Sequence, residues 1–210
     1  MSTTIQTANE TSEIPAGCVQ DSLVRIRIAS TIEEMRARFL AFVLENPDLN
    51  VEQDFSGEIV IMPPAGAQVS SMNSEIAFQL TGWARKYGGW SFDSSAMFVL
   101  ANGAKKSPDA AWIGAERWAA VPVTEREQFP KIAPDFVIEL RSKTDRLQPL
   151  KLKMQEYRDN GVRLGWLVDP QAKQVHVYRP GIEEFVLDNP KMVSGEEVLP
   201  GFALDTARLF

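Results

Sequence analysis

The run Phe-Val-Ile-Glu-Leu at 136–140 is the part of this sequence that most restricts its fold. It follows Pro134-Asp135 and predicts a strand of apolar character. Because side chains alternate between the two faces of a strand, Asp135, Val137 and Glu139 share one face. An isolated carboxylate is costly to bury, so Glu139 should meet a metal ion, a cationic side chain or solvent.

A second segment repeats this pattern, with Pro108-Asp109 entering the run Ala-Ala-Trp-Ile. Proline imposes an extended entry, which puts each aspartate at the start of its strand. If the two strands are neighbours, Asp109 and Glu139 can converge on one Mg²⁺ ion that also keeps waters and a phosphate oxygen. The ion would polarise the phosphate and lower the pKa of an attacking water. The alternative is that these aspartates are turn or capping residues and that Glu139 ends its strand at the rim.

The spacing of apolar residues predicts three helices. The first begins at a capping box, Ser30 with Glu33 or Thr31 with Glu34, and ends near Asn46-Pro47. The second carries its apolar stripe across 69–83 and the third across 147–157, ending at Asn160-Gly161. Strands are predicted at 57–62, 90–92, 97–100, 109–113, 135–140, 164–169, 174–179 and 184–187, and Val24, Ile26 and Ile28 could form a short strand or an arm.

This order of elements predicts an α/β (α+β) domain with a central mixed sheet flanked by helices. A length of 210 residues suits one domain, which we place at 23–210, after a flexible tail at 1–22. The polar first residues do not resemble a signal peptide, and no apolar run is long enough to span a membrane. We therefore expect a cytoplasmic protein.

The composition restricts the metal chemistry. Cys18 is the only cysteine and His176 the only histidine, which excludes zinc sites built on several of these residues. A divalent ion would need oxygen ligands, which favours Mg²⁺ or Mn²⁺. His176 lies in an alternating strand and is expected to be structural. The sequence lacks a nucleotide-binding loop motif, so no nucleotide cofactor is expected. A net charge of −6 argues against broad adhesion to nucleic acid.

Several segments in order resemble the Uma-two family of endonucleases, formerly a domain of unknown function, in the PD-(D/E)xK superfamily. The resemblance is closest to a branch abundant in cyanobacteria and spans about residues 30–205. It implies a restriction-endonuclease-like core, with Asp109 and Glu139 at the positions of the family's metal-binding acids. The matching segments are Gly57–Pro64, Phe92–Ser95, Ser107–Trp112, Pro134–Ser142, Lys153–Tyr157 and Asn160–Pro170.

This chain differs from the superfamily pattern at the position of the pattern's lysine. The ExK arrangement places a lysine two residues after the glutamate, where this chain has Arg141. Arginine stays protonated and cannot exchange a proton with water. Lys151 and Lys153 both flank the apolar stripe of the following helix, so helical geometry does not choose between them. The family's Lys-Met-x-Glu-Tyr run favours Lys153, which would orient the attacking water and stabilise developing charge. The alternative is an ordinary surface lysine.

A third acid is expected from the N-terminal half. The resemblance points to Glu58 and Glu52 as further metal ligands, with Glu75 as a weaker candidate, and each could equally be a solvated acid. Asn73 stands where other members of the family carry a histidine, so no histidine base is expected.

These features predict a Mg²⁺- or Mn²⁺-dependent endonuclease that hydrolyses phosphodiester bonds in DNA. An inactive nuclease-like scaffold that binds nucleic acid or a protein partner is the first alternative, and a hydrolase of another phosphoester is the second. A homodimer is expected from the family analogy and from the five tryptophans available for an interface.

Overall fold

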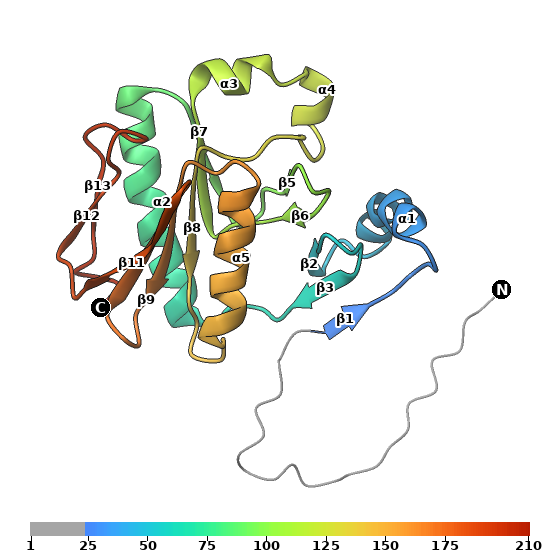
Figure 1. Cartoon of the computed structure of the whole chain (residues 1–210), viewed down its shortest axis with the longest axis horizontal. Helices are drawn as coiled ribbons and strands as arrows, with labels where there is room; N and C mark the ends of the chain where they lie inside the picture. Colours follow the sequence, from blue (N-terminus) through green and yellow to red (C-terminus); the bar gives the residue numbers. More distant parts are fainter. Residues whose placement is uncertain (1–23) are drawn as a thin grey trace, which may run out of the picture.

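A mixed sheet forms the centre of the computed structural model, which describes residues 24–210. Within those residues the sheet has six strands in the order β11-β10-β9-β8-β7-β4 (Figure 1). The β8–β9 pair is parallel and the other pairs are antiparallel. The predicted tail lies outside the described residues. The strands are β4 (Trp90–Asp93), β7 (Ala110–Ile113), β8 (Phe136–Leu140), β9 (Leu164–Asp169), β10 (Gln174–Arg179) and β11 (Ile182–Asp188).

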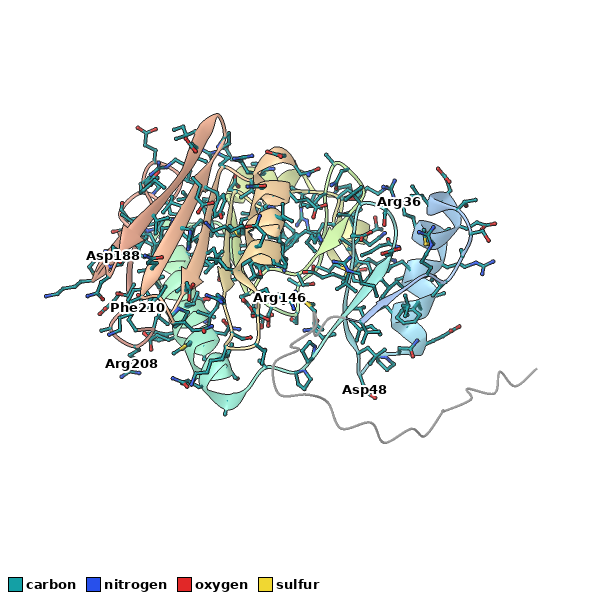
Figure 2. All side chains as sticks on the ribbon, turned by 60° about the horizontal axis from the view of Figure 1, so that its bottom comes forward. Arg36, Asp48, Arg146, Asp188, Arg208 and Phe210 are labelled. Carbon is teal, nitrogen blue, oxygen red and sulfur yellow. The ribbon has the colours of Figure 1, made fainter. Side chains whose placement is uncertain are left out.

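A second sheet, the N-terminal sheet, lies beside helix α1 and combines three strands from the N-terminal part of the described chain with two from residues 98–106 (Figure 1). Figure 2 shows Arg36 and Asp48 in this part of the molecule, and Asp188 and Phe210 at the opposite end. The C-terminal residues add a small two-stranded sheet. The N-terminal sheet contains, in spatial order, β1 (Val24–Ile26), β3 (Ile59–Met62), β2 (Asn50–Gln53), β6 (Lys105–Lys106) and β5 (Phe98–Val99), and the C-terminal sheet contains β12 (Met192–Ser194) and β13 (Ala203–Asp205).

Two helices sandwich the central sheet (Figure 1). Leu80 and Trp83 of α2 pack in the same buried cluster as Phe136 of β8. On the other face, Met154 of α5 packs in a cluster with Val137. Glu139 has the same parity as Val137 and so faces α5. The helices are α1 (Ile32–Glu45), α2 (Ala67–Tyr87), α3 (Ala115–Ala120), α4 (Val123–Arg126) and α5 (Leu147–Asp159).

The local signals locate the long helices well. Thr31 is the N-cap of α1, and its hydroxyl accepts from the Glu34 amide over 3.2 Å. Gly161 follows α5 with a φ of 103°, a backbone conformation that glycine adopts without steric cost. The predicted mixed α/β fold with flanking helices is therefore confirmed. Six short elements had no sequence prediction, namely β2, β6, α3, α4, β12 and β13.

Candidate functional site

The antiparallel pairing of β7 with β8 brings Asp109 to Glu139. Ala110 pairs with Ile138, so the entrance of β7 lies beside the end of β8. The Leu140 amide donates to Oδ2 of Asp109 over 2.7 Å, and Nδ2 of Asn73 donates to Oδ1 over 3.0 Å. Asp109 is thus held on both carboxylate oxygens.

The same antiparallel pairing sends the other Pro-Asp aspartate to the far end of the sheet. Asp135 is 1% exposed and pairs with Arg117 over 2.7 Å and with Arg163 over 3.4 Å. Its Oδ2 also accepts from the Gly114 amide over 2.9 Å. Asp135 therefore serves as a structural residue at a strand entrance, while Asp109 lies beside Glu139.

Lys153 and Glu139 form a buried ion pair. Nζ of Lys153, on α5, lies 2.7 Å from Oε1 of Glu139. The hydroxyl of Tyr157, one turn further along α5, donates to the same Oε1 over 3.0 Å. Of the two candidate lysines, Lys153 thus lies beside Glu139, whereas Lys151 pairs with Glu184 over 2.7 Å.

Glu52, from the N-terminal sheet, also contacts Lys153. It lies on β2, is 4% exposed, and contacts Nζ of Lys153 over 2.9 Å. Its Oε1 also accepts from the Ser107 amide over 2.9 Å. A second buried lysine, Lys106, lies 3.7 Å from Glu52 and 3.1 Å from Glu156. Lys153 therefore bridges an acid from each sheet.

Burial and mutual repulsion alter the acidity of these carboxyl groups. Burial raises the pKa of Glu139 to about 8, with Asp109 and Glu52 adding to the rise and Lys153 opposing it. Burial also raises the pKa of Asp109. In Glu52, burial acts to raise the pKa, but the Lys153 and Lys106 ammonium groups outweigh it and hold the pKa below its usual value. Asp109 and Glu139 therefore ionise at a free-energy cost that an added cation would relieve.

These side chains line a cleft of about 1490 Å³ between the two sheets. The beginning of α2 and the segment after β8 also contribute to its wall. Beside the carboxylates, the lining is largely apolar and includes Val69, Met72, Leu150 and Phe210. Basic side chains at Arg25, Arg141 and Lys143 also line it. The cleft thus combines a charged cluster with apolar and basic surfaces.

The cluster has the composition of a divalent-metal site. Four carboxyl groups, on Glu52, Asp109, Glu139 and Glu156, lie with two ammonium groups, on Lys106 and Lys153, which leaves an excess of two negative charges when all four acids are ionised. Oxygen donors of this kind suit Mg²⁺ or Mn²⁺. Asn73, whose Nδ2 donates to Asp109, has a buried Oδ1 that accepts no hydrogen bond among the described residues.

The ammonium of Lys153 takes the position between Glu52 and Glu139. Accordingly, within residues 24–210, no three His, Cys, Asp or Glu side chains converge as a ready set of ligands. The residues fit a divalent ion by donor chemistry and by charge, and binding requires the ammonium to yield part of this position.

Three other candidate residues lie outside the cluster. Glu58 pairs with Arg27 over 3.3 Å and does not line the cleft. Glu75 contacts Gln79 and Arg208 instead. Arg141 lines the cleft, but its Nη1 contacts Oδ2 of Asp169 over 2.7 Å. We therefore leave Glu58 and Glu75 out of the proposed metal site and give Arg141 a structural role.

Sequence reasoning missed Lys106 and Tyr157. Lys106 lies on a two-residue strand that gives no periodic signal. Tyr157 was counted only in the apolar stripe of its helix, although it lies one turn after Lys153 on the same face. That spacing could have indicated a shared target. His176 is buried, as expected of a structural residue, with Nδ1 2.7 Å from Oε1 of Glu184.

The fold and the site define a nuclease-like protein with a restriction-endonuclease-like core. Residues 36–207 match the model of the Uma2 family, described as "Putative restriction endonuclease", and the chain belongs to this family. Among solved structures, it resembles a "putative nuclease belonging to DUF820" from Anabaena variabilis with a TM-score of 0.68. The two are 23% identical, and the match covers 87% of this chain and 98% of the other. No curated protein matches.

The structure also bears on the membrane question. No helix among the described residues is long and apolar enough to cross a bilayer.

Proposed function

We propose that this protein is a Mg²⁺- or Mn²⁺-dependent endonuclease that hydrolyses phosphodiester bonds in DNA. The observation that supports this most directly is the buried bridge of Lys153 between Glu52 and Glu139, with Asp109 alongside, in a large cleft. Membership of a family described as restriction endonucleases supports the same reaction class.

Each residue of the cluster has a defined task in this proposal. Asp109, Glu139 and Glu52 would hold the divalent ion, which when bound polarises the phosphate and acidifies water. The Leu140 amide and Asn73 keep Asp109 in place. The Lys153 ammonium donates hydrogen bonds toward the attacking water and the charge that builds on the phosphate oxygens. Burial acts to lower the pKa of Lys153, but the carboxylates of Glu139 and Glu52 raise it more, so the net rise keeps the ammonium charged.

Cleavage of supercoiled plasmid DNA with Mg²⁺ or Mn²⁺ tests this function. We compare the wild type with Asp109→Asn and Glu139→Gln, which keep the shape and remove the charge. Glu58→Gln is the control, since Glu58 is an acid that pairs with Arg27 and lies outside the cleft. We expect both cleft variants to lose activity by about 100-fold or more and the control to retain it. Equal activity in all four proteins would remove the cluster from the reaction.

An inactive nuclease-like scaffold is the second candidate. It is favoured by the ammonium of Lys153, which already pairs with both Glu52 and Glu139. Calorimetric titration with Mn²⁺ separates the two, because a scaffold of this kind gives no binding heat that depends on Asp109. A panel of small phosphoesters then distinguishes a nuclease from a hydrolase of another phosphoester.

A further inference from the structure

We propose that Tyr157 is a positioning residue that fixes which oxygen of Glu139 is presented to the divalent ion. This inference rests on the proposed function, because it assigns an additional residue to the same metal site. Tyr157 would act through Glu139, without itself contacting the ion or the substrate.

The contact is specific to one carboxylate oxygen. The Tyr157 hydroxyl and the Lys153 ammonium approach Oε1 of Glu139 over 3.0 and 2.7 Å, respectively. Among the described residues, these hydrogen-bond and ion-pair contacts of Glu139 fall on Oε1. Two donors on Oε1 leave Oε2 as the oxygen available to a cation, so the carboxylate would bind through a defined atom.

The helix makes this arrangement rigid. Lys153 and Tyr157 lie four residues apart on α5, so their side chains emerge from the same face. The Lys153 ammonium lies 5.8 Å from the centroid of the Tyr157 ring. Tyr157 thus contacts both members of the ion pair, through its hydroxyl and through its ring. If the ammonium yields part of its position on metal binding, the tyrosine hydroxyl still restrains Glu139.

Packing alone does not account for the hydroxyl of Tyr157. Tyr157 is 1% exposed, and its ring packs in the apolar cluster around Val137 and Met154. Phenylalanine would fill the same volume without a buried hydroxyl that needs a partner. The Tyr157 hydroxyl instead donates to Oε1 of Glu139, a contact that phenylalanine cannot make.

The chain offers a matched control in Tyr178. This second buried tyrosine donates to Oε2 of Glu184 over 2.8 Å and also packs against the α5 face of the sheet. Glu184 does not line the cleft. Tyr157→Phe and Tyr178→Phe therefore each remove one tyrosine–glutamate hydrogen bond, which is buried for Tyr157 and partly buried for Tyr178, and only the first removes it from the proposed metal site.

The test measures Mn²⁺ affinity by calorimetry, plasmid cleavage and urea unfolding for the wild type and both variants. We expect both variants to remain folded. Tyr157→Phe should weaken Mn²⁺ binding by about tenfold or more, as removal of hydrogen bonds to metal ligands usually does, and Tyr178→Phe should bind as the wild type does.

The outcomes are separable. Wild-type Mn²⁺ affinity in Tyr157→Phe would overturn the positioning role while leaving the proposed function intact. An equal loss in both variants would assign the effect to general stability and would also overturn it. A wild-type protein that binds no Mn²⁺ would overturn the proposed function and this role together.

Discussion

Arg141 and Asp169 form an ion pair across the parallel β8–β9 edge, with Nη1 2.7 Å from Oδ2. Asp169 is 1% exposed, and its other oxygen accepts from the Gln171 and Ala172 amides of the following turn. The residue at the superfamily's lysine position is therefore engaged in holding the β9–β10 turn. In the proposed site, the lysine comes instead from α5, as Lys153.

Replacing Arg141 should affect stability more than metal binding. Arg141→Met leaves the buried Asp169 carboxylate without its cation, which we expect to cost about 2 kcal/mol, reduced from the fully buried case because Arg141 is partly exposed. Urea unfolding measures the loss, and Lys143→Met, an exposed neighbour, is the control. A loss of Mn²⁺ affinity at unchanged stability would instead place Arg141 in the metal site.

The two lysines of α5 should differ sharply in their effect on cleavage. Lys153→Met removes the ammonium that contacts Glu139 and Glu52, and we expect plasmid cleavage to fall by about 100-fold or more. Lys151 lies on the same helix and forms a similar ion pair with Glu184 of β11. Lys151→Met should therefore leave cleavage within about twofold. The measurement is the plasmid cleavage rate of each purified variant. A larger loss of cleavage in Lys151→Met than in Lys153→Met would reject the assignment of Lys153.

The metal-free protein should become less stable as the pH rises. Burial raises the pKa of Glu139 from 4.5 to about 8, so the folded chain holds this proton more tightly than the unfolded chain does. The contribution of Glu139 to stability is therefore complete below about 4.5 and is lost as the pH approaches 8. Its slope can reach about 1.4 kcal/mol per pH unit.

Urea unfolding with a chelator present, at several pH values from 5 to about 8, measures this slope. Glu139→Gln cannot titrate at this position, so its free energy of unfolding should fall less over the same interval. The difference between the two proteins isolates the glutamate from other titrating groups. Parallel curves for the wild type and the variant would show that Glu139 keeps an ordinary pKa.

A homodimer remains a proposal, and the structure narrows which tryptophan could serve it. Four of the tryptophans are largely buried within the chain, whereas Trp90, on the edge strand β4, is 57% exposed. We expect light scattering to give twice the chain mass of 23.4 kDa and Trp90→Ser to weaken the association. A monomer at micromolar concentration would contradict this proposal.

The sequence by itself determined the elements with strong local signals. The Thr31 cap and Asn46-Pro47 bound α1, and apolar alternation with a turn at Asp169-Pro170 gave the β9–β10 hairpin at its observed bounds. The sequence also identified Glu139 as a charge in an apolar strand. The short elements β2, β6, α3 and α4 carried too few residues for a periodic signal, so they could not be predicted in this way.

Tertiary structure alone decided which charges meet. Antiparallel pairing sends Asp109 to Glu139 and Asp135 to the opposite end of the sheet, although both follow the same Pro-Asp pattern. Glu52 reaches the cluster because β2 carries it to Lys153, whereas Glu58, only six residues later, pairs with Arg27. Local sequence fixes the direction of a side chain within its own strand or helix. Which partner it faces depends on strand order, register and helix rotation, which are set by packing between residues far apart in the chain.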